Sequence, residues 1–543
     1  MSRESDLARR SAEIRKFFRS TTSNKATVSQ FLHDVEVEVE GYQAEINRLK
    51  TAIYTLENKR DRLKTTAQLY KSLLAPIHAM PSEILTMIFG YLCEENVLST
   101  NKAPGAVQHL SMVCGRWRDI VDSAPSLWSN IRIDFRSWTK DFQCLTEMTE
   151  RFLKKSGNHP LRLSFLFPAG DLSEGREGAY PALHSLVANC ERWKSLSLRV
   201  APAHFPSDIF RPVRGRLPLL TSLSLALEGS PILWDTPFDY FDNCPALRSL
   251  RATPYVFDLD VEDQAQVSLP WSQIRSLQMF DSYNMWAFPV LYICSGVETL
   301  EVRDIGGLDE DEDYSSHVVN SGIKTLNIAY ASTQAEVDGV LQHTTLAGLT
   351  SLQICSGQDH MAGKNWPTWS DLHLQNFLQR SSCNITSLHL KSLPITDVQM
   401  LSLLRMIPSI VSLSIEEYLE EVENRVVTGT LLHGFAVSAS SQSPSSTSLV
   451  PRLSDLKLVV HAEGLESDLM LKALSTRWLP DPIDAVETGV DCLRSVGIVV
   501  IVPADEANGG HLDGLGCFRD AGMRLCVVYG MLHELYPDDY EPA

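Results

Sequence analysis

The sequence predicts an α/β protein with an N-terminal coiled-coil helix, a small all-helical domain, and then a solenoid built on a parallel sheet. Two patterns support this fold class. Apolar residues recur at strict heptad spacing near the N-terminus, and a short Leu-centred pattern recurs through most of the remaining chain. The first spacing is typical of coiled coils. The second is typical of repeat proteins, whose units bury their apolar faces by stacking on one another.

Composition sets the outer limits on function. The 543 residues are 44% apolar, which is enough for a large core. The net charge of −19 argues against nucleic acid or an anionic membrane as the main partner. The longest apolar run, 498–502, is too short to cross a bilayer, and no secretory signal is visible. The eleven cysteines form no C-x-x-C pair, so we expect neither a zinc site nor a disulfide framework, and a reducing cytoplasmic or nuclear location.

A heptad helix is predicted over residues 35–75, after a polar and locally basic segment at 1–34 that we expect to be a flexible arm. Gly41 weakens the first turns of this helix, and Arg60 places a charge on its apolar seam. The helix either dimerises through residues 35–74 or folds back on its own chain, and the sequence favours neither. The seam consists of Val35, Val39, Tyr42, Ile46, Leu49, Ile53, Leu56, Arg60, Leu63, Ala67, Tyr70 and Leu74.

Two short helices are predicted within residues 76–134. Pro81 and Glu83 indicate the start of the first, because proline needs no hydrogen-bond acceptor in the first turn and a carboxylate suits the positive end of a helix. Two such helices cannot bury a core alone, so we expect this region to pack against something else. Helical spacing defines two apolar faces: Ile84, Leu85, Ile88, Phe89 and Leu92 on the first helix, and Leu110, Val113, Cys114, Trp117 and Ile120 on the second.

The order of these motifs resembles an F-box. The family pattern Leu-Pro-x-Glu-aliphatic-Leu is present with Met80 in place of the leading Leu. A Val-Cys-x-x-Trp-Arg motif follows at 113–118, and Pro-x-Leu-Trp follows at 125–128. The gap between the two helices is longer than usual, and in this it is similar to F-box proteins of mushroom-forming fungi.

The resemblance implies that residues 76–134 bind a Skp-type adaptor and, through it, a cullin. The chain would then be the substrate-recognition subunit of an SCF-type cullin–RING ubiquitin ligase. Some of the matching positions hold an F-box together instead of touching the adaptor, and the sequence does not separate the two groups. The positions that match the family pattern are Pro81, Glu83, Ile84, Leu85, Ile88, Leu110, Val113, Cys114 and Trp117.

A leucine-rich-repeat-like solenoid is predicted over residues 135–543. The recurring unit is an aliphatic residue, a spacer, Ser or Thr, Leu, a variable residue and another aliphatic residue. In a parallel rung the Leu and aliphatic side chains point into a shared core, while Ser/Thr and the variable residue point outward. The Asn of regular leucine-rich repeats is missing, so the unit resembles the irregular repeats that follow many F-boxes. Longer steps predict loop insertions near 357–372 and 436–451, and the acidic run at 309–313 predicts a further loop near 305–320. The central residues of the eleven copies are Leu196, Leu223, Leu250, Leu277, Leu300, Leu326, Leu352, Leu388, Leu413, Leu456 and Val496.

The variable positions predict a substrate-binding row, because in stacked rungs they line the concave face. They mix charges and amides, which suits the surface of a folded or extended protein better than a polyanion. The alternative is that they are only solvated strand residues. The predicted substrate-binding residues are Arg251, Gln278, Glu301, Asn327, Gln353 and His389.

Motifs for catalysis are absent from the sequence: it contains no G-x-S-x-G, H-E-x-x-H or P-loop pattern. We therefore expect no enzymatic activity, no cofactor and no metal. A second functional hypothesis is a non-catalytic scaffold that self-associates through the coiled coil and binds through the solenoid without delivering a substrate. Co-purification with a cullin would separate this hypothesis from the ligase subunit.

Overall fold

The computed structural model divides the chain into two compact units, Met1–Leu85 and Thr86–Ala543. Most of residues 1–24, which belong to the arm predicted at 1–34, and most of the three predicted insertions lie outside the described residues. The described residues are 9, 11–12, 15–16, 25–99, 105–138, 140–167, 177–201, 205–227, 238–253, 256, 267–280, 290–303, 317–357, 366, 368–417, 425–437, 448–502 and 512–531.

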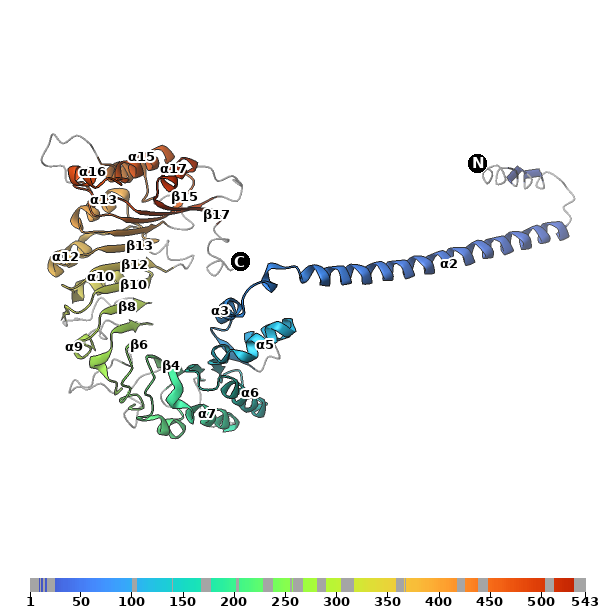
Figure 1. Ribbon diagram of the computed structural model, residues 1–543, viewed down its shortest axis with the longest axis horizontal. Helices are drawn as coiled ribbons and strands as arrows, with labels where there is room; N and C mark the ends of the chain where they lie inside the picture. Colours follow the sequence, from blue (N-terminus) through green and yellow to red (C-terminus); the bar gives the residue numbers. More distant parts are fainter. Residues whose placement is uncertain are drawn as a thin grey trace. The chain divides into compact units, whose positions relative to one another are not determined.

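The first unit is dominated by a single long helix, α2 (Lys25–Ser72) (Figure 1). It begins at Lys25 instead of the expected Val35, because Val28 and Leu32 continue the heptad spacing upstream. It ends shortly before Pro76, whose ring cannot be accommodated inside a helix. Its large apolar side chains lie mostly in solvent: Val35 is half-buried, and the other large apolar members of the seam from Val28 to Tyr70 are exposed by 37% or more.

Three helices follow, and they form the region that resembles an F-box. They are α3 (Ser82–Leu92), α4 (Ala106–Val113) and α5 (Gly115–Ser123), and a short 3₁₀ helix at Pro125–Trp128 comes after them. Helix α3 carries Glu83 in its first turn, as the sequence indicates.

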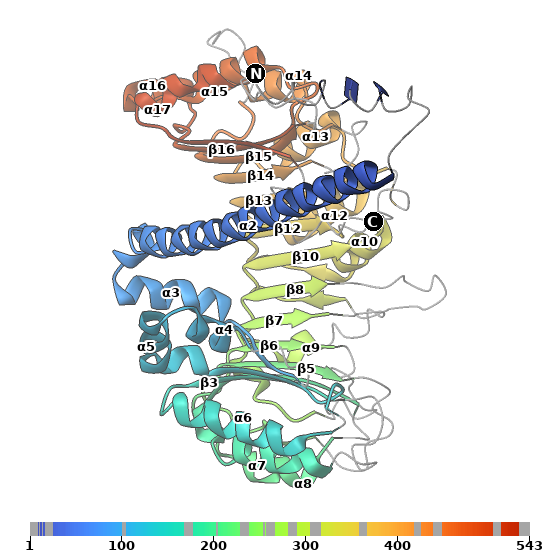
Figure 2. The same ribbon diagram turned by 90° about the vertical axis from the view of Figure 1, so that its right-hand side faces the viewer.

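The second unit is built on one sheet of fifteen parallel strands, and their order in space is their order in the chain. This order is the mark of a solenoid, in which each rung contacts only its neighbours. Figure 2 shows the strands following one another as rungs. Strands β9 (Val318–Val319) and β11 (Thr344–Thr345) form a separate small sheet. The main strands are β1 (Asn96–Leu98), β2 (Asn130–Asp134), β3 (Leu161–Leu166), β4 (Trp193–Val200), β5 (Ser222–Leu227), β6 (Ser249–Ala252), β7 (Ser276–Met279), β8 (Thr299–Arg303), β10 (Thr325–Ala331), β12 (Ser351–Ser356), β13 (Ser387–Lys391), β14 (Ser412–Glu416), β15 (Asp455–His461), β16 (Ser495–Ile501) and β17 (Arg524–Gly530).

The predicted fold class is confirmed: a long N-terminal helix, an F-box-resembling region and an α/β solenoid with a parallel sheet follow one another along the chain. All eleven copies of the Leu pattern form strands, from β4 to β16. Within the described part of the main sheet, four further strands were not predicted from the sequence: β1, β2 and β3 at one end and β17 at the other.

Helices pack on one face of this sheet. In Figure 1 the strands lie on the inner side of the second unit's arc, and helices such as α10 and α12 lie on its outer side. Within the described residues, no helix is both long enough and apolar enough to span a membrane. The helices that connect the rungs are α6 (Phe142–Lys155), α7 (Tyr180–Val187), α8 (Ser207–Phe210), α9 (Val290–Ile293), α10 (Gln334–His343), α12 (Leu372–Ser381), α13 (Asp397–Met406), α14 (Gly429–Phe435), α15 (Ser467–Arg477), α16 (Pro482–Thr488) and α17 (Gly516–Asp520).

The core lies between the sheet and these helices. Along each rung the central Leu and the next aliphatic residue are buried, as for Leu196 and Leu198, while their neighbours Ser195 and Ser197 are half-buried. The half-buried residues face the other side of the sheet, called here the open face. A row of hydroxyl residues starts the rungs on this face, and adjacent members are paired in register: Ser195, Ser222, Ser249, Ser276, Thr299, Thr325, Ser351, Ser387 and Ser412.

The insertion near 357–372 contains two tryptophans that the structure describes. Trp366 and Trp369 stack with ring centroids 5.7 Å apart, and both are buried. The Trp366 indole N–H donates to Gln334 Oε1 of α10 at 3.2 Å. These two rings therefore anchor the end of the insertion against the helices of the solenoid.

Candidate functional site

Helix α3 has one buried and one exposed apolar side. Leu85 and Phe89 are buried, at four-residue spacing. Ile84, Met87 and Ile88 are exposed by 44%, 63% and 41%, and Tyr91 and Leu92 are exposed at the end of the helix. Exposed apolar residues that cluster on one helix indicate a binding surface more often than single ones do. Helix α3 therefore presents an apolar face that is exposed in the described part of the chain.

Helices α4 and α5 meet at Cys114, which is extended and caps α5. Its Sγ atom accepts a hydrogen bond from the Trp117 backbone N–H at 3.4 Å. The half-buried Trp117 ring packs on Phe89 of α3, with centroids 4.6 Å apart. Leu110 is buried in α4, whereas Val113 at its end is 60% exposed. The Val-Cys-x-x-Trp motif thus supplies a helix cap and an aromatic contact with α3.

The predicted adaptor-binding residues fall into three groups. Leu85 and Leu110 are buried and unavailable to a partner in the folded protein. The sequence missed the exposed Met87, Tyr91 and Met112. The signal for the first two was present, because they lie three and seven residues after Ile84 on the same helix. Exposed members of the predicted set are Pro81, Glu83, Ile84, Ile88 and Val113, and half-buried members are Cys114 and Trp117.

A buried asparagine joins this helical region to the sheet. The Asn96 side chain donates to the carbonyls of Leu127 at 2.9 Å and Asn130 at 3.0 Å, and its Oδ1 accepts from the Val107 N–H at 3.3 Å. Asn130 in turn donates to the Cys93 carbonyl at 3.1 Å. Because a buried amide left without partners is costly, these contacts hold the helices at a fixed position on the first two strands.

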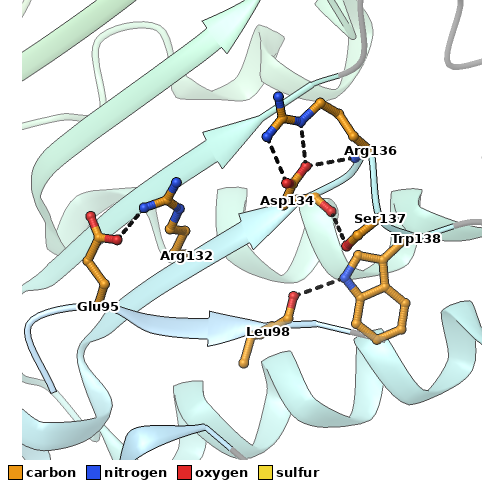
Figure 3. Close-up of polar contacts among 7 residues, drawn as sticks. All are labelled: Glu95, Leu98, Arg132, Asp134, Arg136, Ser137 and Trp138. Atoms are coloured by element: carbon orange, nitrogen blue, oxygen red, sulfur yellow. Dashed lines mark hydrogen bonds and ion pairs between the residues drawn. The ribbon is translucent and has the colours of Figure 1, made fainter. Parts of the chain in front are cut away.

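The first strands carry further contacts (Figure 3). The Trp138 indole N–H donates to the Leu98 carbonyl at 3.0 Å, and Arg132 forms an ion pair with Glu95. Asp134 accepts from both the Nε and a terminal nitrogen of Arg136, each at 2.9 Å, and these bonds lower the pKa of its carboxyl. The end of the helical region is therefore part of the solenoid's sheet and not a flexible linker.

Residues 77–134 match the family model described as F-box-like. They form an F-box-like domain. The match covers α3, α4, α5 and strand β2, and strand β1 lies within it. No curated protein matches the chain. The F-box-like domain therefore supplies the first two strands of the sheet as well as the exposed apolar side of α3.

The predicted substrate-binding residues form one continuous row on the open face. Each is the register partner of the next: Arg251 pairs with Gln278, Glu301 with Asn327, and Gln353 with His389. The row continues from His389 to Ser414 and Lys457. It is called here the variable row. The structure thus brings together, on consecutive strands from β6 to β13, six residues that span more than a hundred positions of sequence.

Glu416 is the centre of a charged cluster at the C-terminal part of this row. The Lys457 ammonium lies 2.7 Å from Glu416 Oε1, and Lys391 Nζ lies 4.0 Å from Oε2. His389 Nε2 lies 3.3 Å from Oε1, at ion-pair distance but outside hydrogen-bonding geometry. Burial would raise the pKa of Glu416, but His389 and Lys457 outweigh it and lower the pKa to about 2. The carboxylate is therefore charged at neutral pH and fixes the cations around it.

Two arginines, Arg251 in the row and Arg303 beside it, lie over aromatic rings. The Arg251 guanidinium is 4.5 Å from the centroid of Phe280, and that of Arg303 is 5.2 Å from the centroid of Tyr330. Arg303 also forms an ion pair with Glu301. Such contacts hold the planar cations in one orientation.

Three polar atoms of the variable row are buried without a hydrogen-bond partner in the described part of the chain. They are Asn327 Oδ1, His389 Nε2 and Ser414 Oγ. Buried polar atoms in native proteins nearly always have a partner, so these three belong to a small group of exceptions among the described residues; His389 Nε2 still lies at ion-pair distance from Glu416. The only thiol in direct contact with the row among the described residues is Cys355, and burial raises its pKa, which disfavours the reactive thiolate. The row therefore presents amide, hydroxyl, imidazole and charged groups, and Cys355 adds no reactive thiolate to them.

Proposed function

We propose that this chain is a substrate-recognition subunit of an SCF-type cullin–RING ubiquitin ligase, without catalytic activity of its own. The F-box-like domain binds a Skp-type adaptor, and through it a cullin, while the variable row of the solenoid binds a protein substrate. The observation that carries the proposal is the F-box-like match at residues 77–134 on a domain that shares its sheet with the solenoid.

The shared sheet supports delivery of a substrate. Strand β1 pairs with β2, and β2 pairs with β3, so the F-box-like domain continues directly into the rungs. Because Asn96 and Trp138 lock this junction, an adaptor bound to the domain stays at a constant distance from anything bound to the variable row. Constant geometry is what a ligase subunit needs, since the acceptor lysine must lie within reach of the transferred ubiquitin.

The adaptor surface is proposed to centre on the exposed side of α3. Met87 and Ile88 are large, apolar and accessible, and Tyr91 adds a 74% exposed aromatic ring that can also hydrogen-bond. Leu85 and Leu110 are buried, so the proposed surface does not include them. A double change of Ile84 and Leu85 to Ala would confound folding with binding, so the test uses exposed residues only.

The decisive experiment compares Met87→Glu/Ile88→Glu with Ile483→Glu/Val486→Glu in the full chain. Each double change places two carboxylates on exposed apolar residues of a helix, α3 in the first case and α16 in the second. Adaptor affinity, measured by titration calorimetry with a purified Skp-type adaptor, should fall at least about 30-fold for the α3 variant, because a charge is desolvated at the contact. The α16 variant should bind as the unchanged chain does.

Cullin recovery distinguishes the remaining outcomes. The unchanged chain, expressed in cells, should co-purify with the adaptor and a cullin, and the α3 variant should lose both. Adaptor binding that survives the α3 change in a folded protein contradicts the proposed surface. Adaptor binding without any cullin favours the second function, a scaffold that self-associates through α2 and binds through the solenoid, for which the exposed seam of α2 is the supporting observation.

A further inference from the structure

Helix α2 exposes an apolar seam along most of its length, with Val35 half-buried. In heptad notation the a positions are Lys25, Leu32, Val39, Ile46, Ile53, Arg60 and Ala67, and the d positions are Val28, Val35, Tyr42, Leu49, Leu56, Leu63 and Tyr70. The large members from Val39 to Tyr70 are 45–70% exposed. A seam of this length on a helix of 48 residues is stabilised by a second helix of matching pattern.

Charge divides α2 into two halves. Residues 34–45 contain five acidic side chains and no Lys or Arg, whereas residues 48–71 contain seven Lys or Arg and two acidic side chains. Helix α2 is therefore complementary in charge to itself when a second copy runs in the opposite direction, and repels itself when the second copy runs in the same direction.

The seam residues themselves show which direction packs better. Ile and Val at a with Leu at d are typical of parallel dimers. However, a parallel dimer stacks each position on its own copy, so Arg60 would face Arg60, Ala67 would face Ala67, and Tyr42 would face Tyr42. The first contact buries two like charges and the second leaves a gap in the core.

An antiparallel dimer removes these conflicts, because each a residue then faces a d residue of the second copy. With Ile53 opposite Leu56, Tyr42 faces Ala67 and Arg60 faces Leu49. Large residues then meet small ones, and the Arg60 stem lies along an aliphatic side chain with its guanidinium directed to solvent. This register is centred between residues 54 and 55.

The same register also pairs the flanking e positions. Glu36 lies beside Lys71 of the second copy, Gln43 beside Lys64, and Lys50 beside Glu57. None of these contacts joins like charges. By contrast, a parallel dimer would pair Glu45 with Lys50, which is attractive, and Lys59 with Lys64, which is repulsive.

We propose that α2 forms an antiparallel coiled coil with a second copy of this chain. The Ser72 ends of the two helices then lie about 50 Å apart on opposite sides of the dimer centre, since each residue advances about 1.5 Å. The proposal does not rest on the proposed ligase function, because it follows from the exposure, charges and volumes of α2 alone.

Energy transfer between site-specific dyes on the full chain measures the direction. Dyes enter through genetically encoded reactive residues, so the native cysteines remain unlabelled. A donor at 36 in one copy and an acceptor at 71 in the other should show strong transfer, because the two sites lie side by side. Donor and acceptor both at 36 should show weak transfer, since these sites lie about 55 Å apart. The reverse result would establish a parallel dimer and overturn the proposal.

Charge reversal provides an independent test by sedimentation of the full chain. Glu36→Lys and Lys71→Glu should each weaken self-association about tenfold, because each creates two repulsive pairs in the dimer. The combined variant should return to within about twofold of the unchanged chain. If the combined variant self-associated more weakly than either single variant, the antiparallel dimer would be contradicted. A chain that remains monomeric at about 10 µM would contradict it as well. A monomer would indicate instead that α2 folds back or stays single.

Discussion

Helix α2 and the rungs of the sheet use the same aliphatic residues with opposite outcomes. On α2, Leu49 and Leu56 are 48% and 64% exposed, whereas Leu300 and Leu326 on consecutive rungs are fully buried. Both segments repeat regularly, but a rung has a neighbour of the same pattern on either side in its own chain. Helix α2 has no such neighbour among the described residues of its own unit.

The difference shows that a repeated apolar pattern predicts the unfolding free energy of a single chain only when the segment that packs against it belongs to the same chain. Rung Leu residues contribute to the unfolding free energy of one molecule, since every neighbour is covalently attached. Seam residues of α2 contribute mainly to association, so their effect depends on protein concentration. Fluorescence separates the two effects, because all ten tryptophans lie after residue 85 and report on the second unit.

The largest expected difference is between Leu326→Ala and Leu49→Ala. Leu326 is fully buried between Leu300 and Leu352 of the adjacent strands, so the change should lower the unfolding free energy of the second unit by about 2–5 kcal/mol. Leu49→Ala should leave this transition unchanged and weaken self-association. Urea unfolding followed by tryptophan fluorescence measures the first quantity, and sedimentation measures the second. If Leu49→Ala shifted the fluorescence transition as much as Leu326→Ala does, the seam of α2 would contribute to the stability of the second unit, and the proposed difference between the two regions would be wrong.

Buried and exposed residues can also be compared through their ion pairs, by the contribution of a carboxylate to the unfolding free energy. The pKa of Glu416 is about 2 in the folded protein and near 4.5 ordinarily, so its charged form stabilises the fold. This contribution is complete above about pH 4.5 and is lost as the pH falls toward 2. Glu416→Gln should lower the unfolding free energy at pH 7 by an amount on the order of 3 kcal/mol, and the difference from the unchanged chain should shrink in that pH window.

Glu298→Gln is the matched control for Glu416→Gln. Glu298 lies on the solvent side of its rung and pairs with Lys324 at 2.8 Å, with both side chains well exposed. Exposed pairs contribute little, so no measurable pH-dependent change in urea unfolding is expected. A loss at Glu298 as large as that at Glu416 would show that burial is not what distinguishes the two carboxylates.

The smallest expected effect is a gain at Gly41→Ala. Gly41 occupies a c position of α2, away from the seam, and a Cβ atom there would meet no other atom within 4 Å. Replacing a helical glycine by alanine should stabilise each helix by about 1 kcal/mol. Self-association measured by sedimentation should tighten, while the fluorescence transition of the second unit should not move. Weaker self-association of Gly41→Ala would indicate that Gly41 contacts the second copy, where an added Cβ atom would clash.

Most of the solenoid could be predicted because its determinant is local. Each rung carries Ser or Thr, Leu and an aliphatic residue at fixed spacing, and alternation alone assigns Leu277 to the core and Gln278 to the open face. Strand β3 was missed because Arg162 occupies the position of the usual hydroxyl residue. Strand β1 has three residues, too few for any periodic signal, and it exists only because β2 lies beside it.

The candidate site was only partly predictable for a similar reason. The motif located the F-box-like domain, but helical spacing gave Ile84 and Leu85 equal weight, although one is 44% exposed and the other is buried. Which side of a short apolar helix is covered depends on tertiary packing, such as the contact of Phe89 with Trp117. The unpaired atoms of Asn327 and His389 also depend on neighbouring strands and leave no trace in local sequence.

Strands β1 and β2 give the F-box-like domain a second task, protecting the end of a sheet against aggregation. An open edge offers unpaired backbone groups to other chains, and proteins protect such edges with short terminal strands. Strand β1, three residues long and fastened by Asn96, is such a terminus. A chain shortened to begin at Phe135 would uncover β3, a six-residue strand with buried Leu161, Leu163 and Phe165. Deleting the F-box-like domain from the solenoid would therefore expose a strand edge that can pair with other chains and cause aggregation.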